Sequence, residues 1–264
     1  MTDIHIAYAV SPNYWFDRCH FSIVSILRHA NPNDKYHFYI ISTEFPDNVL
    51  RQFFSLPKYK EAEFVFYFVS SEEFKDIAHD TVLGESAYYR LKIPTLIQAD
   101  KCLYLDSDTM IVNDIAELYN HNIDDYLCGM VEDKCSKGMW ARCQDSMQEG
   151  DTFFNSGMML MNLDKIRAEG IEGKLFEVLR QYEYTDQDAI NHVFRGRILS
   201  LPLKYNIVPL VSDSVYCGRL QEYLSALCDP VVIHPPYRHE IQKIIKWYEE
   251  YYQEYEKIVS QIQC

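Results

Sequence analysis

Short apolar segments alternate with helical patterns through the first half of the chain. The apolar segments predict strands at residues 4–10, 36–42, 63–70 and 101–105. The segments between them favour helices at residues 17–30, 46–56 and 86–99, the last with a kink or restart at Pro94. Because strands joined by crossover helices run parallel, we expect an α/β fold with a mostly parallel sheet and helices on both faces.

The second half of the chain is less regular. Its apolar runs predict strands at residues 128–133 and 157–163, and its longer periodic segments predict helices at residues 164–182 and 186–195. Between the two strands, residues 134–151 have the mixed polar character of a loop or lid. Ligands of open α/β sheets bind beyond the carboxyl ends of the strands, so we expect the chemistry just after residues 10 and 105.

The C-terminal segment has a helical stripe of apolar residues three and four positions apart. The stripe consists of Ile241, Ile245, Tyr248, Tyr252, Tyr255, Val259 and Ile262. We therefore expect a catalytic domain over residues 1–240 and, over residues 241–264, an amphipathic helix. The helix would pack on its own domain or at an interface with a partner, including a second copy of the chain. A membrane-surface helix is less favoured, because its polar faces are not predominantly basic.

The net charge of the chain argues against some classes of binding partner. The 264 residues include 25 basic and 39 acidic side chains, a formal net charge of −14. This excess of acid argues against a nucleic-acid partner and against simple docking on anionic lipid. The eight cysteines lack the spacing of a zinc site or a disulfide framework, so we expect reduced thiols.

Neither a signal peptide nor a transmembrane segment is apparent in the hydropathy pattern. The N-terminus has no basic region followed by a long apolar run, and no stretch approaches about 18 apolar residues. We expect a cytoplasmic protein, with peripheral attachment to the inner face of the membrane left open.

Two carboxylates follow the fourth predicted strand. Asp106 and Asp108 flank Ser107 directly after the apolar run 102–105. In extended chain, residues two apart point the same way, so both carboxylates can face one small volume. There they repel each other unless a cation lies between them, and carboxylates favour Mg²⁺ or Mn²⁺. The alternative is a simple acidic turn.

His234 is the candidate for a third ligand. It follows the apolar strand 231–233 and precedes two prolines, which places it at a strand end. An imidazole nitrogen suits Mn²⁺ better than Mg²⁺, so we expect Mn²⁺, with Mg²⁺ as the alternative. We interpret the other histidines as structural.

Taken together, these motifs resemble glycosyltransferase family 8, over about residues 5–247. That family includes bacterial lipopolysaccharide galactosyl- and glucosyltransferases and the glycogenins. The segment 9–14 resembles its nucleotide loop, which implies that Tyr14 stacks on uracil and that Ala9 and Asn13 contact the nucleoside. Ser11 stands where the family usually has an acidic residue; its hydroxyl can still form a hydrogen bond.

The resemblance also assigns donor-site residues. Asp106 and Asp108 match the family's metal-binding pair, His234 matches its third metal ligand, and Ser107 lies between the aspartates at the nucleotide. The remaining motifs are a helix at 87–92 with a donor-binding arginine, an FNxG segment at 154–157 and a DQD segment at 186–188. They imply donor-sugar or phosphate contacts from Arg90, Asn155, Ser156, Asp186 and Gln187, with the backbone at Ser156 and Gly157 approaching the sugar.

The match weakens after His234. Tyr237 and Glu240 stand where the family has a glycine and a diphosphate-binding lysine. Arg238, Lys243 or Lys246 can replace that lysine, and Lys246, directly before a tryptophan, is the slight favourite.

The resemblance implies a GT-A (Rossmann-like) fold and a retaining hexosyltransferase. A UDP-sugar would donate glucose or galactose to a hydroxyl of a glycan or glycolipid, such as a lipopolysaccharide. Gln187 and Asp186 would lie at the catalytic centre, and Gln187 is a weak nucleophile, which favours front-face attack over double displacement. Two alternatives remain: a UDP-sugar-binding protein without transfer activity, and a sugar nucleotidyltransferase, although segment 9–14 has none of the glycines of a phosphate loop.

Overall fold

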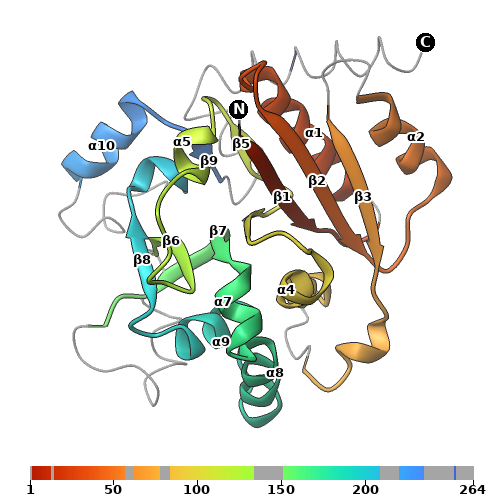
Figure 1. Ribbon diagram of the computed structural model, residues 1–264, viewed down its shortest axis with the longest axis vertical. Helices are drawn as coiled ribbons and strands as arrows, with labels where there is room; N and C mark the ends of the chain where they lie inside the picture. The colour runs from red at the N-terminus through yellow and green to blue at the C-terminus, as the bar shows by residue number, and fades with distance from the viewer. Residues whose placement is uncertain are drawn as a thin grey trace.

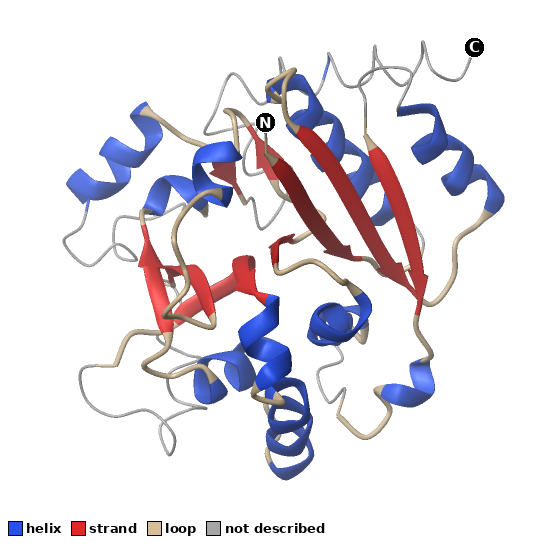
Figure 2. Cartoon of the chain, viewed as in Figure 1, coloured by secondary structure: helices blue, strands red, loops and turns tan. Residues whose placement is uncertain are grey.

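The computed structural model describes residues 2–12, 15–56, 62–77, 84–133, 151–208, 220–234 and 253. Among these residues, seven strands form one sheet in the order β3-β2-β1-β4-β7-β6-β8 (Figures 1 and 2). The strands are β1 (Asp3–Ala9), β2 (Lys35–Ser42), β3 (Glu63–Phe68), β4 (Lys101–Leu105), β6 (Cys128–Glu132), β7 (Phe154–Asn162) and β8 (Ile198–Leu201). Two short strands, β5 (Met110–Ile111) and β9 (Val232–Ile233), form a separate pair.

Most strand pairings are parallel, as predicted. β1 pairs parallel with β2 and β4, β2 with β3, and β6 with β8. Within the seven-stranded sheet the exception is β7, which lies antiparallel between β4 and β6, and the separate β5–β9 pair is also antiparallel. This reversal brings the start of β7 to the carboxyl end of β4, where the two aspartates follow.

Helices cover both faces of the sheet. Ile4, Ile6 and Tyr8 of β1 point to a core shared with α1 (Trp15–His29) and α2 (Asp47–Ser55). Ala7 and Ala9, which alternate with them, point to a second core. The helices of that second face are α3 (Ser86–Tyr89), α4 (Ile93–Leu96), α7 (Leu163–Ala168), α8 (Ile171–Gln181) and α9 (Asp186–Val193). Burial on both faces explains the continuous apolar runs of β1 and β4.

Two predicted helices are interrupted. Residues 86–99 form α3, a 3₁₀ turn η3 (Arg90–Lys92) and α4, with Pro94 in the first turn of α4. Proline fits that position because its missing N–H has no partner there in any helix. Residues 164–182 divide into α7 and α8 at Gly170, whose φ of 60° is in the left-handed region that glycine tolerates.

Several short elements were not predicted. They are η2 (Ser71–Glu73), β5, α5 (Ala116–Tyr119), β8, η4 (Leu203–Tyr205) and α10 (Leu220–Cys228). Most are too short for hydrophobic periodicity to identify. The β5–β9 pair, with Met110 opposite Ile233, matters most, because it brings His234, the residue after β9, beside the two aspartates.

Two sequence predictions lie outside the described residues, namely the loop at 134–151, except for Asp151, and the amphipathic helix at 241–264, of which only residue 253 is described. The division into a catalytic domain and a C-terminal helix therefore stays a prediction. In the described part of the chain, no helix has both the length and the apolar character needed to cross a bilayer.

His20 illustrates how tightly α1 packs, and it gives a test of the fold. Its ring is buried and meets the Phe53 ring of α2 edge-on, with centroids 5.5 Å apart. Burial lowers its pKa to about 4, so the ring is neutral in the folded state at neutral pH. The unfolded chain takes up this proton near pH 6.5, so His20 makes the fold lose stability as pH falls from 6.5 toward 4.

We therefore expect His20→Leu to flatten the acid dependence of stability. Between pH 7 and pH 4.5, the free energy of unfolding of the parent should fall by up to about 3 kcal/mol more than that of the variant. Urea unfolding followed by circular dichroism at both pH values measures the difference. Parallel pH dependences for the two proteins would contradict this account of His20.

Candidate active site

Asp106, Ser107 and Asp108 leave the carboxyl end of β4, beside β1, where the sequence predicts the chemistry. The Asp106 N–H donates to the Gly157 carbonyl on β7 at 2.8 Å. The Asp106 carbonyl accepts from the Thr109 N–H at 3.1 Å and from the Thr109 hydroxyl at 2.8 Å. These bonds close a turn in which Ser107 is buried while both carboxylates stay partly accessible.

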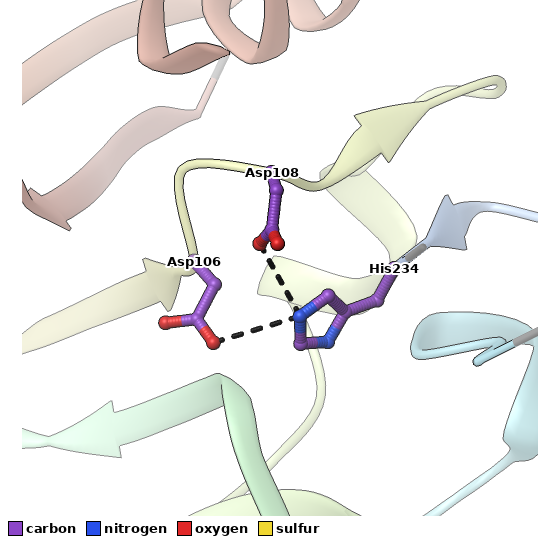
Figure 3. A group of neighbouring side chains, drawn as sticks. All are labelled: Asp106, Asp108 and His234. Carbon is purple, nitrogen blue, oxygen red and sulfur yellow. Dashed lines mark ion pairs between the residues drawn. The ribbon is translucent and has the colours of Figure 1, made fainter. Parts of the chain in front are cut away.

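His234 faces both carboxylates from β9 (Figure 3). Its Nε2 lies 3.3 Å from Asp108 Oδ1 and 3.6 Å from Asp106 Oδ2. The β5–β9 pairing carries His234 to this position, and its own N–H donates to the Ile207 carbonyl at 2.8 Å. The structure thus brings together the three side chains that the sequence predicts as metal ligands, although more than a hundred residues separate them.

The donor set fits a divalent cation. One ligand atom from each of Asp106, Asp108 and His234 lies within 4.8 Å of the other two. Carboxylate oxygens with a single imidazole nitrogen suit Mn²⁺ and accommodate Mg²⁺ less well. The three residues also leave room for ligands from a substrate, because a six-coordinate cation needs more than they supply.

Gly157 is what permits this close arrangement. A Cβ built at Gly157 would lie 2.1 Å from His234 Cε1 and 2.8 Å from Asp106 Oδ2. No side chain tolerates such contacts, so the glycine leaves the space that the imidazole ring and the carboxylate occupy. The role expected from the sequence, close approach of the backbone to the sugar, is a different one and stays a prediction.

Arg90 forms ion pairs with both Asp106 and Asp186, and so joins the metal-site turn to the DQD segment. Its Nη2 lies 3.0 Å from Asp106 Oδ1, and its Nε lies 3.2 Å from Asp186 Oδ2. Its Nη1 donates to the Ser156 carbonyl at 2.9 Å, and the guanidinium stacks 4.6 Å from the centre of the Tyr104 ring. All three guanidinium nitrogens thus contact protein groups, so direct contact of Arg90 with the donor stays a prediction.

Burial and charge act against each other at Arg90 and Asp186. Burial alone would lower the pKa of Arg90, but the carboxylates of Asp106 and Asp186 raise it above its ordinary value. Burial raises the pKa of Asp186 to about 6, against the opposing effect of Arg90. Both groups are therefore charged at neutral pH, and the buried pair depends on each partner being present.

His234 and Asp108 behave as an ion pair. Burial lowers the pKa of His234, but the hydrogen bond and charge of Asp108, together with the charge of Asp106, raise it overall. Burial raises the pKa of Asp108, but His234 and then Arg18 lower it below its ordinary value. The imidazole thus offsets carboxylate charge at the position that suits a cation.

Two successive backbone amides on β7 orient two predicted donor-site side chains. The Ser156 N–H donates to Gln187 Oε1 at 2.8 Å, and the Gly157 N–H donates to Asn155 Oδ1 at 3.0 Å. The amide nitrogens of Gln187 and Asn155 then both donate to Asp133 Oδ2, at 3.1 and 3.3 Å. The FNxG and DQD segments therefore form one hydrogen-bonded unit.

Among the described residues, some that touch this site were not predicted from the sequence, namely Arg18, Tyr104, Asp133 and Asn206. Asp133 was placed inside the predicted strand 128–133, but β6 ends at Glu132, so Asp133 lies just beyond a strand end as Asp106 does. Tyr104, whose hydroxyl donates to Asp106 Oδ1 at 2.5 Å, is inconspicuous within its strand. Arg18, 3.8 Å from Asp108, and Asn206, 3.1 Å from His234, lie in no motif that marks them.

The nucleotide loop is only partly described. Ala9 is buried at the end of β1, and Ser11 is partly exposed just beyond it. Asn13, Tyr14 and Lys246 lie outside the described residues. The nucleotide contacts predicted for these five residues and for Ser107 therefore stay predictions.

The chain resembles known proteins in both sequence and fold. The chain is 26% identical over 263 residues to the lipopolysaccharide 1,2-glucosyltransferase of Escherichia coli K12, which covers 93% of this chain and 76% of that protein. It is 26% identical over 213 residues to the lipopolysaccharide 1,3-galactosyltransferase of Salmonella typhimurium, 76% of this chain and 63% of that protein.

Among solved structures, the fold resembles the galactosyltransferase LgtC crystallised with donor and acceptor sugar analogues. That likeness has a TM-score of 0.72 at 22% identity and covers 90% of this chain and 88% of LgtC. The bifunctional glycosyltransferase WbbM gives a TM-score of 0.76 at 24% identity, over 88% of this chain and 45% of WbbM. These likenesses confirm the predicted GT-A fold. The sequence model of glycosyl transferase family 8 matches residues 5–237, and the chain belongs to that family.

Proposed function

We propose that this protein is a retaining hexosyltransferase that moves glucose or galactose from a UDP-sugar to a hydroxyl of a glycan or glycolipid. The observation that carries the proposal is the cluster of Asp106, Asp108 and His234 at the carboxyl end of β4. It lies beside the Arg90–Asp186 pair and the amides of Asn155 and Gln187. A cation site next to a group of polar sugar-binding side chains is what transfer from a nucleotide sugar requires.

We assign Mn²⁺ to the cluster because its donors include an imidazole nitrogen. A bound cation supplies Lewis-acid stabilisation of the charge that develops on the departing UDP. Arg90 holds Asp106 on one side and Asp186 on the other, so it sets the spacing between the metal site and the sugar site. Its buried positive charge also offsets part of the negative charge of the aspartates.

The contacts of Gln187 support front-face attack within an ion pair. Gln187 Oε1 already accepts from the Ser156 N–H at 2.8 Å and from the Ser156 hydroxyl at 3.2 Å. An amide oxygen committed to two donors is a poor nucleophile. Asp186, buried against Arg90, is better suited to accept sugar hydroxyls than to form a covalent bond.

The names of the similar proteins suggest the acceptor. The glucosyltransferase of Escherichia coli and the galactosyltransferase of Salmonella typhimurium both act on lipopolysaccharide, and we propose an acceptor of that class for this chain. The proposal also includes a cytoplasmic location and association of copies through the C-terminal helix. It assigns nucleotide contacts to Ala9, Ser11, Asn13, Tyr14, Ser107 and Lys246.

Removal of either metal carboxylate should abolish most of the activity. Asp106→Asn and Asp108→Asn each remove a charge that holds the cation, and we expect Mn²⁺-dependent UDP release from UDP-glucose or UDP-galactose to fall by roughly 100-fold or more. Asp125→Asn, at an exposed position between α5 and β6, is the matched control and should retain the parent rate. Parent-like rates in either site variant would overturn the metal assignment.

Gly157 gives a second test, through shape rather than charge. Gly157→Ala should reduce both Mn²⁺ affinity and UDP release at least tenfold, because the new methyl group would displace His234. The control is Gly173→Ala in α8, where an added Cβ meets nothing within 4 Å and should slightly stabilise the helix. Calorimetric Mn²⁺ titration of both variants makes the comparison. A Gly157→Ala protein that binds Mn²⁺ as the parent does would contradict the role of the glycine.

A further inference from the structure

We propose that Asn206 is a positioning residue that fixes the proton of His234 on Nδ1, so that Nε2 keeps its lone pair for the cation. The inference rests on the proposed metal site and adds to it a side chain that touches neither the cation nor the substrate. Asn206 Oδ1 lies 3.1 Å from His234 Nδ1, on the side of the ring away from the two aspartates (Figure 3 shows the ring and the aspartates).

The position of the His234 ring proton follows from a series of hydrogen bonds that begins at the Gly157 backbone N–H, a group that can only donate. The Gly157 backbone N–H donates to Asn155 Oδ1 at 3.0 Å, which establishes that this atom of Asn155 is the oxygen. The amide nitrogen of Asn155 donates in the other direction, to Asp133 Oδ2 at 3.3 Å. Both ends of the Asn155 amide are therefore determined by partners that cannot exchange roles, a backbone N–H and a carboxylate.

Asn155 in turn determines Asn206. The Asn206 atom 2.8 Å from Asn155 Oδ1 must be a donor, because two oxygens cannot share a hydrogen bond without a proton. That atom is therefore Nδ2, and Oδ1 of Asn206 faces the imidazole. An amide oxygen only accepts, so His234 must donate from Nδ1. Once the Nε2 proton of the His234–Asp108 ion pair gives way to a cation, the sole proton of the neutral ring lies on Nδ1, and the Nε2 lone pair faces that cation between Asp106 and Asp108.

The backbone prevents Asn206 from leaving this position. The Ile207 N–H donates to the Val232 carbonyl at 2.9 Å, and the Ile207 carbonyl accepts from the His234 N–H at 2.8 Å. Ile207 and Ile233 are buried in one small cluster with Met110 of β5. Asn206, only 2% exposed, is thus tied to the same backbone pair that carries His234, and the two side chains are positioned together.

Without Asn206, the neutral ring can place its proton on Nε2 and donate it to Asp108, which blocks the nitrogen that the cation needs. Partners of this kind typically contribute a factor of about 10 to 100 to metal affinity. The network also links the metal ligand to the sugar site, because Asn155 and Gln187 both end on Asp133.

Two variants separate positioning from structural support. Asn206→Leu is close in volume and can neither accept nor donate a hydrogen bond. Asn206→Asp still accepts from His234 Nδ1 but places a second acceptor against Asn155 Oδ1, so it should lower the melting temperature. We expect Mn²⁺ titration by calorimetry at pH 7.5 to give an Asn206→Leu dissociation constant at least tenfold above that of the parent. The Asn206→Asp value should stay within about threefold, despite its lower melting temperature.

A purely structural role predicts the opposite order, with Mn²⁺ affinity following the melting temperature. Parent-like affinity in Asn206→Leu, or an equal loss in Asn206→Asp, would overturn the role of Asn206 while leaving the metal site intact. Absence of Mn²⁺ binding in the parent would instead remove the proposed function and this inference together. Should Asn206→Leu fail to fold, Asn206→Ala carries the same test.

Discussion

Mutual repulsion among three carboxylates is the constraint on which this site depends. Asp106 and Asp108 lie together after β4, Asp106 shares Arg90 with Asp186, and burial makes the charges of Asp108 and Asp186 costly. The protein offsets that cost with Arg90 beneath Asp106 and Asp186, and with His234 and Arg18 beside Asp108. We propose that a divalent cation completes this balance, so that the same residues serve both stability and chemistry.

The fold creates this convergence through one reversed strand and one short pair. Antiparallel β7 places its first residues against the end of β4, so that Ser156 and Gly157 supply backbone N–H groups and space at the same point. The β5–β9 pair returns the chain to the aspartates and delivers His234. β7 also contributes buried side chains to both cores, whereas the β5–β9 pair is short, and together they determine where the Asp106, Asp108 and His234 side chains lie.

The sequence predicted the first half of the fold well because its strands form apolar runs, although only β1 and β4 are buried along most of both faces and β3 is partly exposed. It predicted Asp106 and His234 because each directly follows an apolar run, and Asp108 because it stands two residues after Asp106. It did not predict β5 or β8, since their lengths of two and four residues leave no periodicity to detect. It also gave no warning that Arg90 binds protein groups, because its partners lie far away in the chain.

Asn206 and Asp133 also could not be predicted from the sequence. Their proposed roles depend on the direction of a series of hydrogen bonds. That direction is determined by the Gly157 backbone N–H, which can only donate to Asn155. A sequence records neither the direction of a hydrogen bond nor the proximity of residues 133, 155, 206 and 234. The family motifs therefore identified residues proposed to touch metal or sugar, and missed those that hold them in place.

We propose that Asp106, Asp108 and His234 bind one cation together with the diphosphate of the donor. The most direct measurement is anomalous diffraction from crystals of the protein grown with Mn²⁺ and UDP. The account predicts one strong manganese peak about 2.0 to 2.3 Å from a carboxylate oxygen of each aspartate and from His234 Nε2. A peak elsewhere, or no peak among these three side chains in crystals that contain bound UDP, would contradict it.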